Sequence, residues 1–580
     1  MPALNQKRLV NLILLLLFIL SVTVRLPNLN RPISRHHEYT LANALRYQQI
    51  WYEEGGLKHR FCLITTYGNK ADKNICNDAR LRDSGGNYYY TSNPPFAYMF
   101  SYFVFSVFDV YPDVLPLEVL NLVLHFICCL FIFQIISLLT KRYYVDRLNV
   151  PALIGFTVYL FSPATLWFHA NTYMQDVFVQ PLFIIGIYVF LRLIISEGQR
   201  RIYYALLGLI NLFMIYTDWL GVFFAFSVFI YALVKMRGRE ARMVLSIITI
   251  TSVAALALMT WQYSQIAGPD PFLETLAKRY SARSGFVQQL FHLQLEHLPP
   301  EVVFPPPLRD KISYNIDAGT LRFKGIMSGE ERQQLLKLSS DELYKRAIEE
   351  LFRQCHWFGA SFTSLGSWRV LAFYYIINYL PFLVFLLIIA LIDYASFKEH
   401  FTDMFYKNKT AIVALYLSTA PVVMHNIVFF NFNVTGDYSV IKIGVLIAVL
   451  TALFYHRFIL DENKPVREGV LRLIFYLMVL GSILQYLVIN CHYLKGHDHY
   501  KRIGEEIAKV AKREETVFIK ANIMQSIPCP IVFYARRNIA MWRNDTHARE
   551  LLKLNSVERG VIFVLNNDNS GIAETAYINK

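Results

Sequence analysis

Long apolar runs recur along most of the chain and are separated by polar segments of very different lengths. A helix needs about 20 residues to cross a hydrocarbon core of roughly 30 Å, and eleven runs approach that length. They cover residues 9–24, 117–140, 150–168, 177–195, 202–216, 220–234, 244–261, 370–392, 411–430, 439–455 and 471–489. The pattern therefore predicts an α-helical polytopic membrane protein with about eleven transmembrane helices.

A twelfth apolar run, residues 95–110, decides the topology. It is short, opens at Pro94 and Pro95, and closes at Asp109 and Pro112. If it crossed the membrane, the Lys and Arg residues of the later short loops would move to the side opposite Lys7 and Arg8, against the positive-inside rule. We therefore predict that this helix lies along the membrane face and that the N-terminus is cytoplasmic.

This topology places nearly half of the chain outside the cytoplasm, in three long segments. The third of them alternates amphipathic helices (500–513 and 546–553) with apolar strands (516–520, 531–535 and 560–566), which predicts a small α/β domain. The expected organisation is a membrane module at 1–262 with a first outer loop at 25–115, a second outer loop at 263–367, C-terminal transmembrane helices at 368–490, and an extracytoplasmic α/β domain at 491–580.

The first outer loop opens with a helical pattern over residues 37–53, which Gly55 and Gly56 should end. Its apolar positions fall on one stripe, so we expect an amphipathic helix at the membrane surface. Farther along the loop, Cys62 and Cys76 could form a disulfide in an oxidising compartment or remain thiols, and the sequence leaves both readings open.

Composition agrees with a membrane protein, because 55% of the 580 residues are apolar and only 17% are charged. The net charge of +14 would suggest nucleic acid for a soluble protein. Here many of the cations fall in the predicted cytoplasmic loops, so membrane lipids are expected partners and nucleic acid is not. Those loops are too short for a nucleotide-binding domain.

The densest group of candidate functional residues follows the first span. Its cations are Arg25, Arg31, Arg35, His36 and His37, which could bind a phosphate, and Glu38 directly after them could accept a proton. The alternative is a set of juxtamembrane side chains solvated among lipid headgroups.

Further candidates lie at the outer ends of later spans. Asp176 opens the fourth span, Asp218 lies in a short turn between two spans, and Asp437, Tyr438 and Lys442 begin the tenth. Asp176 could instead cap its helix, and Lys442 could extend to the membrane surface.

The order of these features resembles the GT-C glycosyltransferases, and within them the branch of protein O-mannosyltransferases and the aminoarabinose transferase of lipid A. The resemblance rests on RPISRHHEYT (31–40), YYYTSNPPFAY (88–98), NTYMQDVFVQP (171–181) and GDYSVIK (436–442). The sequence differs from the family pattern at three positions. His37 and Glu38 replace an Asp-Glu pair, Asn93 replaces a basic residue or His, and Asp218 replaces a Lys.

The resemblance implies an enzyme that moves a hexose or pentose from a polyprenyl-phosphate-linked donor to a glycan, lipid or protein acceptor. Glu38 would be the base, with Asp176 in reserve. Arg25, Arg35, His36, His37 and Lys442 would hold the donor phosphate, and Tyr90, Asn93, Asp218, Asp437 and Tyr438 are candidates for the substrate pocket. No cofactor is required, although a divalent metal held by Glu38 and Asp176 is an open alternative.

The expected location is a bacterial-type inner membrane with an extracytoplasmic active site. A transporter or flippase of lipid-linked saccharides is the alternative function. The scarcity of mid-span charges, the lack of inverted repeats and the large outer segments argue against it.

Overall fold

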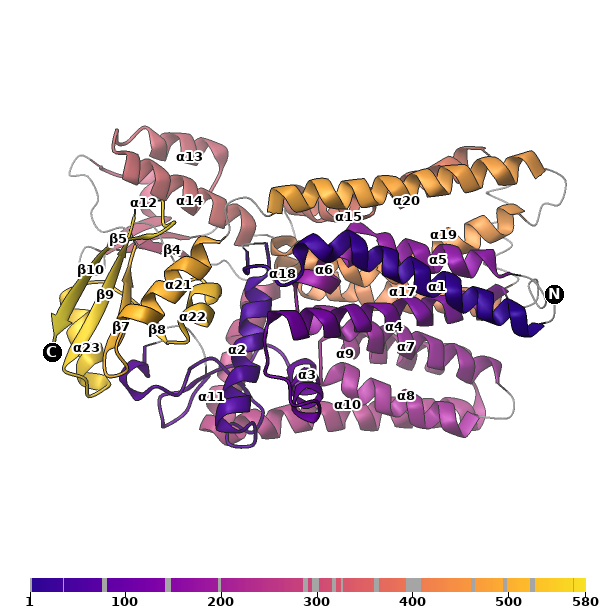
Figure 1. Cartoon of the computed structure of the whole chain (residues 1–580), viewed down its shortest axis with the longest axis horizontal. Helices are drawn as coiled ribbons and strands as arrows, with labels where there is room; N and C mark the ends of the chain where they lie inside the picture. Colours follow the sequence, from indigo (N-terminus) through magenta and orange to yellow (C-terminus); the bar gives the residue numbers. More distant parts are fainter. Residues whose placement is uncertain are drawn as a thin grey trace.

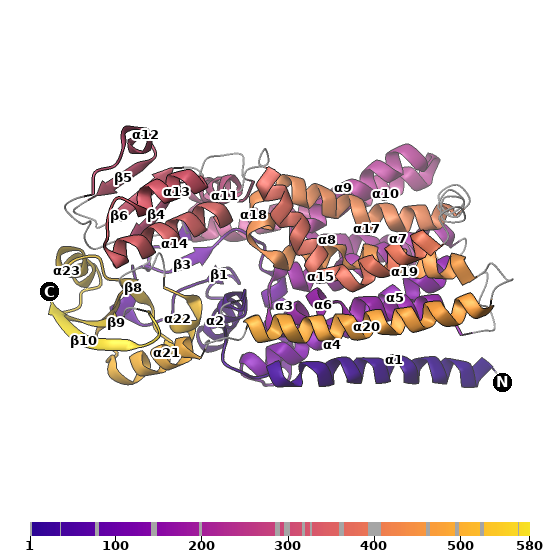
Figure 2. The same ribbon diagram turned by 90° about the horizontal axis from the view of Figure 1, so that it is seen from above.

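The computed structural model of the chain describes residues 3–34, 36–75, 81–140, 148–196, 200–284, 290–294, 302–315, 320–324, 327–358, 365–392, 408–459, 465–493, 498–521, 527–566 and 568–580. Long helices lie side by side in a bundle, with the N-terminus at one end of the long axis and the C-terminus at the other (Figures 1 and 2). The two outer loops and the C-terminal domain gather at the end away from the N-terminus, called here the domain end (Figure 1).

All eleven apolar runs form helices in the bundle. Its helices are α1 (Ala3–Arg25), α4 (Val114–Thr140), α5 (Val150–Phe161), α6 (Pro163–Asn171), α7 (Gln175–Ile195), α8 (Arg200–Ile215), α9 (Leu220–Lys235), α10 (Gly238–Ala267), α15 (Leu365–Ile392), α17 (Lys409–Val428), α18 (Phe430–Thr435), η4 (Asp437–Ile443), α19 (Gly444–Ile459) and α20 (Pro465–Tyr493). The predicted class, a polytopic helical membrane protein, is therefore confirmed.

Fewer than eleven of these helices are long enough to span by length and composition. Within the described residues, eight pass, and nine if α5 and α6, which meet at a 56° bend, count as one span. The bend follows from Pro163, which has no N–H to continue the hydrogen-bond ladder of α5. Helices α8 and α9 have 16 residues each, or about 24 Å, which is shorter than a typical hydrocarbon core.

The first outer loop crosses the domain end of the bundle. It contains η1 (Leu26–Asn28), α2 (Tyr39–Glu54), β1 (Leu63–Ile64), η2 (Lys70–Asp72), β2 (Leu81–Arg82), β3 (Tyr88–Tyr90) and α3 (Phe96–Val107). Helix α2 confirms the predicted helix but not its exposed polar face, because Arg46, Gln48 and Gln49 are buried as well. It ends before Gly55, whose φ of 90° favours glycine. It lies across the ends of the membrane helices (Figure 1), and its apolar stripe is buried.

Helix α3, formed by the twelfth apolar run, is too short to span. Its 12 residues extend about 18 Å. The N–H of Phe96 donates to the carbonyl of Tyr216 at 3.2 Å, and the hydroxyl of Tyr173 donates to the carbonyl of Ala97 at 2.8 Å. These contacts fix the start of α3 to the domain ends of α8 and α6, in agreement with a helix that lies along the membrane face.

The second outer loop forms its own small core. Helix α11 (Pro269–Ser284) follows α10 after Gly268, and β4 (Leu290–Gln294), α12 (Pro306–Arg309), β5 (Ile312–Asn315), β6 (Thr320–Lys324), α13 (Gly329–Leu336) and α14 (Glu342–Phe358) complete the segment. The three strands form an antiparallel sheet in the order β4-β6-β5. Leu321 and Phe323 of this sheet pack against Ile348 and Leu351 of α14.

The C-terminal segment confirms the predicted α/β domain. It contains α21 (His499–Val510), β7 (Thr516–Lys520), α22 (Cys529–Ala535), β8 (Ile539–Met541), α23 (Asp545–Leu554), β9 (Arg559–Leu565) and β10 (Ile572–Asn579). The sheet order is β10-β9-β7-β8, with β7 parallel to both neighbours and β10 antiparallel.

The strand expected at residues 531–535 is wrong, because these residues form helix α22. Pro530 has no N–H to donate in a sheet, but it fits the first turn of a helix, where that N–H would have no partner in the helix. Strands β8 and β10 were not predicted. Cys62 is a buried thiol that donates to the carbonyl of Gln262 at 3.7 Å, whereas Cys76 lies outside the described residues.

The C-terminal domain packs onto the first outer loop through buried polar contacts. The Nε of Arg537 donates to the Asp72 carboxylate at 2.6 Å, and the amide of Asn538 donates to its other oxygen at 3.0 Å. Asn538 also accepts from the N–H of Tyr67 at 2.8 Å. Because Asp72 is fully buried, its charge depends on these partners.

We expect Arg537→Met to destabilise this interface by about 3–5 kcal/mol, because it leaves a buried carboxylate without its cation. The neighbouring Arg536 pairs with Glu53 at the surface and provides a matched control. Arg536→Met should cost less than about 1 kcal/mol. Unfolding midpoints and limited proteolysis of the C-terminal domain would measure both effects, and equal effects of the two variants would contradict this account.

The predicted topology places Leu57 and Arg239, both exposed, on opposite sides of the membrane. Cysteines introduced singly at these positions should react differently with a membrane-impermeant maleimide. The background carries Cys76→Ser, Cys491→Ser and Cys529→Ser, because the other cysteines are buried. The Leu57→Cys protein should be labelled in intact cells, and the Arg239→Cys protein only after permeabilisation. The reverse pattern would refute the topology.

Candidate functional site

The candidate residues meet where the first outer loop crosses the domain end of the bundle. Residues 31–38 lie between η1 and α2 and bring in the cationic cluster with Glu38. The break between α6 and α7, the turn between α8 and α9, and the segment from α17 to η4 supply the other acidic and basic side chains. The site therefore combines segments that are far apart in the sequence.

Glu38 is buried and held by several donors. The Arg31 guanidinium binds both of its carboxylate oxygens, one of them at 3.0 Å, and the N–H of Ser34 donates to one of these oxygens. Arg31 also donates to Asn171 at 3.3 Å, and its guanidinium lies 5.7 Å from the ring centroid of Trp167. This two-point contact orients the carboxylate and supplies a counter-charge.

His36 and His37 contact Asp437, about 400 residues away in the sequence. Their Nε2 atoms lie 3.3 Å and 2.9 Å from the two carboxylate oxygens. His37 has a φ of 58°, in the left-handed region that few non-glycine residues adopt. Its ring also packs edge-on against Tyr438 at 4.8 Å between centroids. The contacts join the start of α2 to η4.

Asp176 and Lys442 form a fully buried ion pair. The ammonium of Lys442 also donates to Nε2 of His425 at 2.9 Å and lies 3.9 Å from the Asp218 carboxylate. Burial raises the pKa of Asp218 to about 6, and the Lys442 ammonium opposes that shift. Gln175 donates to the second oxygen of Asp176 at 2.9 Å. This cluster joins α7, the α8–α9 turn, α17 and η4.

Arg283, at the end of α11, is a site residue that the sequence did not reveal. It donates to Asn93 at 3.2 Å and to the hydroxyl of Tyr90 at 2.7 Å, and its guanidinium lies 4.6 Å from the ring centroid of Phe432. The only signal in the sequence was Asn93 itself, which stands where the family resemblance implies a basic residue.

At Asn93 and Asp218 this sequence lacks the basic residue of the family pattern. In the structure, a cation from elsewhere in the chain lies beside each of these two positions. Arg283 contacts Asn93, and Lys442 lies near Asp218. Both cations come from segments distant in sequence. The charge expected at each position is therefore present in space, although a different residue carries it.

Arg25 lies apart from these clusters. It is fully buried between α1 and α4, where its guanidinium contacts Nδ1 of His125 at 2.8 Å, and that imidazole stacks on His169 at 4.5 Å. Its role as a phosphate ligand stays a prediction. Arg35 lies outside the described residues.

Two groups of side chains have the donor atoms for a metal ion within 4.8 Å of one another, among the residues described. One is His36, His37 and Asp437, and the other is Asp176, Asp218 and His425. Neither group contains the Glu38 and Asp176 pair that the sequence suggested. In the second group, the Lys442 ammonium already contacts the donor atoms, so a metal does not fit there.

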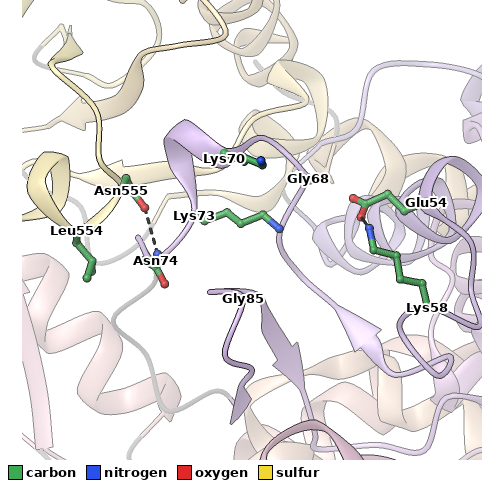
Figure 3. Close-up of a pocket in the computed structure, with 9 residues that line it drawn as sticks. All are labelled: Glu54, Lys58, Gly68, Lys70, Lys73, Asn74, Gly85, Leu554 and Asn555. Carbon is green, nitrogen blue, oxygen red and sulfur yellow. Dashed lines mark hydrogen bonds and ion pairs between the residues drawn. The ribbon is translucent and has the colours of Figure 1, made fainter.

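A separate pocket lies between the first outer loop and the C-terminal domain (Figure 3). It has a volume of about 380 Å³ and is lined by Glu54, Lys58, Gly68, Lys70, Lys73, Asn74, Gly85, Leu554 and Asn555. Asn74 donates to Asn555 at 3.3 Å across the junction. The hydrogen bond with His59 lowers the pKa of Glu54 to about 2.

This pocket is at the opposite end of α2 from Glu38. A 16-residue helix is about 24 Å long. The pocket is therefore not part of the cluster around Glu38, and α2 is the element that connects the two.

No protein-family model and no curated protein sequence matches the chain. Solved structures do. ArnT from Cupriavidus metallidurans bound to undecaprenyl phosphate matches with a TM-score of 0.51 at 12% identity, over 96% of this chain and 93% of that one. The oligosaccharyltransferase of Archaeoglobus fulgidus in complex with zinc and sulfate matches with a TM-score of 0.53 at 11% identity, over 95% of this chain and 67% of that one.

The oligosaccharyltransferase AglB from Archaeoglobus fulgidus, in complex with an inhibitory peptide and a dolichol-phosphate, matches with a TM-score of 0.51 at 10% identity, over 95% of this chain and 69% of that one. Identities this low establish the fold and not the activity. The agreement extends over nearly the whole chain, including both outer loops and the C-terminal segment. The chain therefore has the GT-C fold that its motifs resemble.

Proposed function

We propose that this protein is a glycosyltransferase that moves a hexose or pentose from a polyprenyl-phosphate-linked donor to a glycan, lipid or protein acceptor. The observation that carries the proposal is the cluster of carboxylates and cations at the domain end of a GT-C membrane bundle. Structures of the same fold were determined with undecaprenyl phosphate and with a dolichol-phosphate. A lipid-linked donor would reach such a cluster from the bilayer.

The reaction needs a base and a cationic site for the departing phosphate. Glu38 would take the proton of the acceptor hydroxyl while the acceptor oxygen forms a bond to the anomeric carbon. The bond from that carbon to the phosphate oxygen breaks, and the polyprenyl phosphate leaves with the electron pair. His36, His37 and Lys442 would stabilise the charge on that phosphate.

The contacts of Arg31 support a mechanism in which the donor binds before the base becomes active. In the structure Arg31 binds both oxygens of Glu38, so the lone pairs that would accept a proton are already engaged. A donor phosphate beside Arg31 would compete for its N–H groups and weaken its hold on Glu38. Donor binding would thus prepare the base before the acceptor reacts.

The remaining predicted residues are assigned to substrate contact or to support of these groups. Tyr90 and Asn93, oriented by Arg283, would contact the sugar or the acceptor. Asp437 and Tyr438 would hold the histidines in position, and Asp218 would help to hold Lys442. Asp176, which Lys442 neutralises, is the reserve base.

We also propose that the protein lies in an inner membrane of bacterial type, with its active site on the extracytoplasmic face. The gathering of both outer loops and the C-terminal domain at one end supports a single working face (Figure 1). The GT-C fold supports an enzyme over a transporter or flippase of lipid-linked saccharides. No metal or other cofactor is assigned to the reaction.

Glu38→Gln keeps the size and hydrogen-bonding capacity of the side chain but removes the base. We expect turnover to fall by roughly 100-fold or more, with donor binding retained. Glu515→Gln is a matched control, because Glu515 is also buried and accepts a hydrogen bond, from the N–H of Lys512 at 2.9 Å, in the C-terminal domain. Near-normal turnover of Glu38→Gln would transfer the role of base to Asp176.

The donor class is tested with purified protein in nanodiscs. A polyprenyl-phosphate sugar should support transfer to an acceptor, and a nucleotide sugar without lipid carrier should not. The variants His36→Gln and His37→Gln should weaken donor binding more than acceptor binding. Transfer from a nucleotide sugar alone would overturn the assignment, and movement of an unaltered lipid-linked sugar across the membrane would favour the transporter.

A further inference from the structure

Three buried side chains at the domain end have the chemistry of a divalent metal site. Asp176 comes from α7, Asp218 from the α8–α9 turn and His425 from α17, and one donor atom of each lies within 4.8 Å of the others. Two carboxylates and an imidazole are ligands that zinc and manganese accept. Their burial would also protect a bound ion from water.

The ammonium of Lys442 lies among these donor atoms. It forms an ion pair with Asp176, donates to His425 at 2.9 Å, and lies 3.9 Å from Asp218. The Lys442 side chain is completely buried. Two of the three donors are thus hydrogen-bonded by its N–H groups, and its charge offsets that of Asp218, which accepts from the N–H of Leu220 at 2.8 Å.

A metal and this ammonium cannot share the cluster. Ligand distances for zinc, magnesium and calcium are about 2.0–2.6 Å, so an ion within reach of the three donors would lie in nearly the same place as the nitrogen. The two positive charges, without water between them, would repel each other strongly. Since Nε2 of His425 accepts from Lys442, that imidazole is also already engaged.

We propose that Lys442 is a built-in cation that takes the place of a divalent metal at the Asp176, Asp218 and His425 cluster. The ammonium neutralises and orients Asp176, as a bound ion would. The link to catalysis rests on the proposed function, but the occupation of the cluster by Lys442 does not.

The test measures metal binding and needs no substrate. His36 and His37 are first replaced by Gln in the full-length protein, because their group with Asp437 also has metal-binding donors. Mn²⁺ is then added to this background protein in detergent, and its binding is measured by electron paramagnetic resonance. Any bound Mn²⁺ reports on the Lys442 cluster. With Lys442 present, we expect no stoichiometric Mn²⁺.

Lys442→Ala in the same background removes the ammonium and vacates its space. We expect this variant to bind one Mn²⁺ at least roughly 100-fold more tightly than its parent. Addition of Mn²⁺ should also raise its melting temperature, since the ion binds only the folded state. Asp218→Asn added to Lys442→Ala should abolish both effects. Lys442→Met, which removes the charge but fills the space, is the matched control and should bind weakly.

Two results would overturn the proposal. One is stoichiometric Mn²⁺ in the parent that is lost on Asp218→Asn, because the metal would then bind beside Lys442. The other is a folded Lys442→Ala protein that takes up no Mn²⁺. If Lys442→Ala does not fold, Lys442→Ser, which leaves nearly the same space beside a small polar group, serves in its place, and the parent measurement stands by itself. Failure of sugar transfer would change none of these results, so the two proposals fail separately.

Discussion

The structure depends on the high cost of burying a charge without a partner. The domain end of the bundle buries Glu38, Asp176 and Asp437, and each is matched by cationic or imidazole groups. Arg31 pairs with Glu38 within the first outer loop, whereas Lys442 and the two histidines pair with carboxylates hundreds of residues away in the chain. Charge pairing thus sets how the first outer loop, α7 and η4 meet, and apolar packing fills the space around them.

The helices could be predicted from the sequence because each apolar run carries its own signal. The number of helices that are long enough to span a membrane could not be predicted in the same way, because Pro163 bends one span and the α8 and α9 runs are short. Residues 531–535 show the limit for short segments. Five apolar residues suit a strand or a buried helix equally well, and only the preceding proline favoured the helix that formed.

The candidate site was predictable as a list of residues and not as a set of contacts. Most residues named from the motifs lie together, but nothing local indicates that His37 should meet Asp437 or that Lys442 should reach Asp176. Arg283 was missed because it ends an ordinary amphipathic helix in a polar loop. Pairing across hundreds of residues is a property of the fold, and sequence periodicity does not report it.

The contact between Arg283 and Asn93 has a consequence for how such proteins diverge. When a charge is supplied from a second segment, the position that once held it is free to change, while the field in the site stays nearly constant. An alignment that scores each position separately records the loss of a basic residue at one position and the gain of a basic residue at another, with no link between them. Two chains of one fold can therefore hold the same charge in a site while the matched positions of their sequences carry different residues.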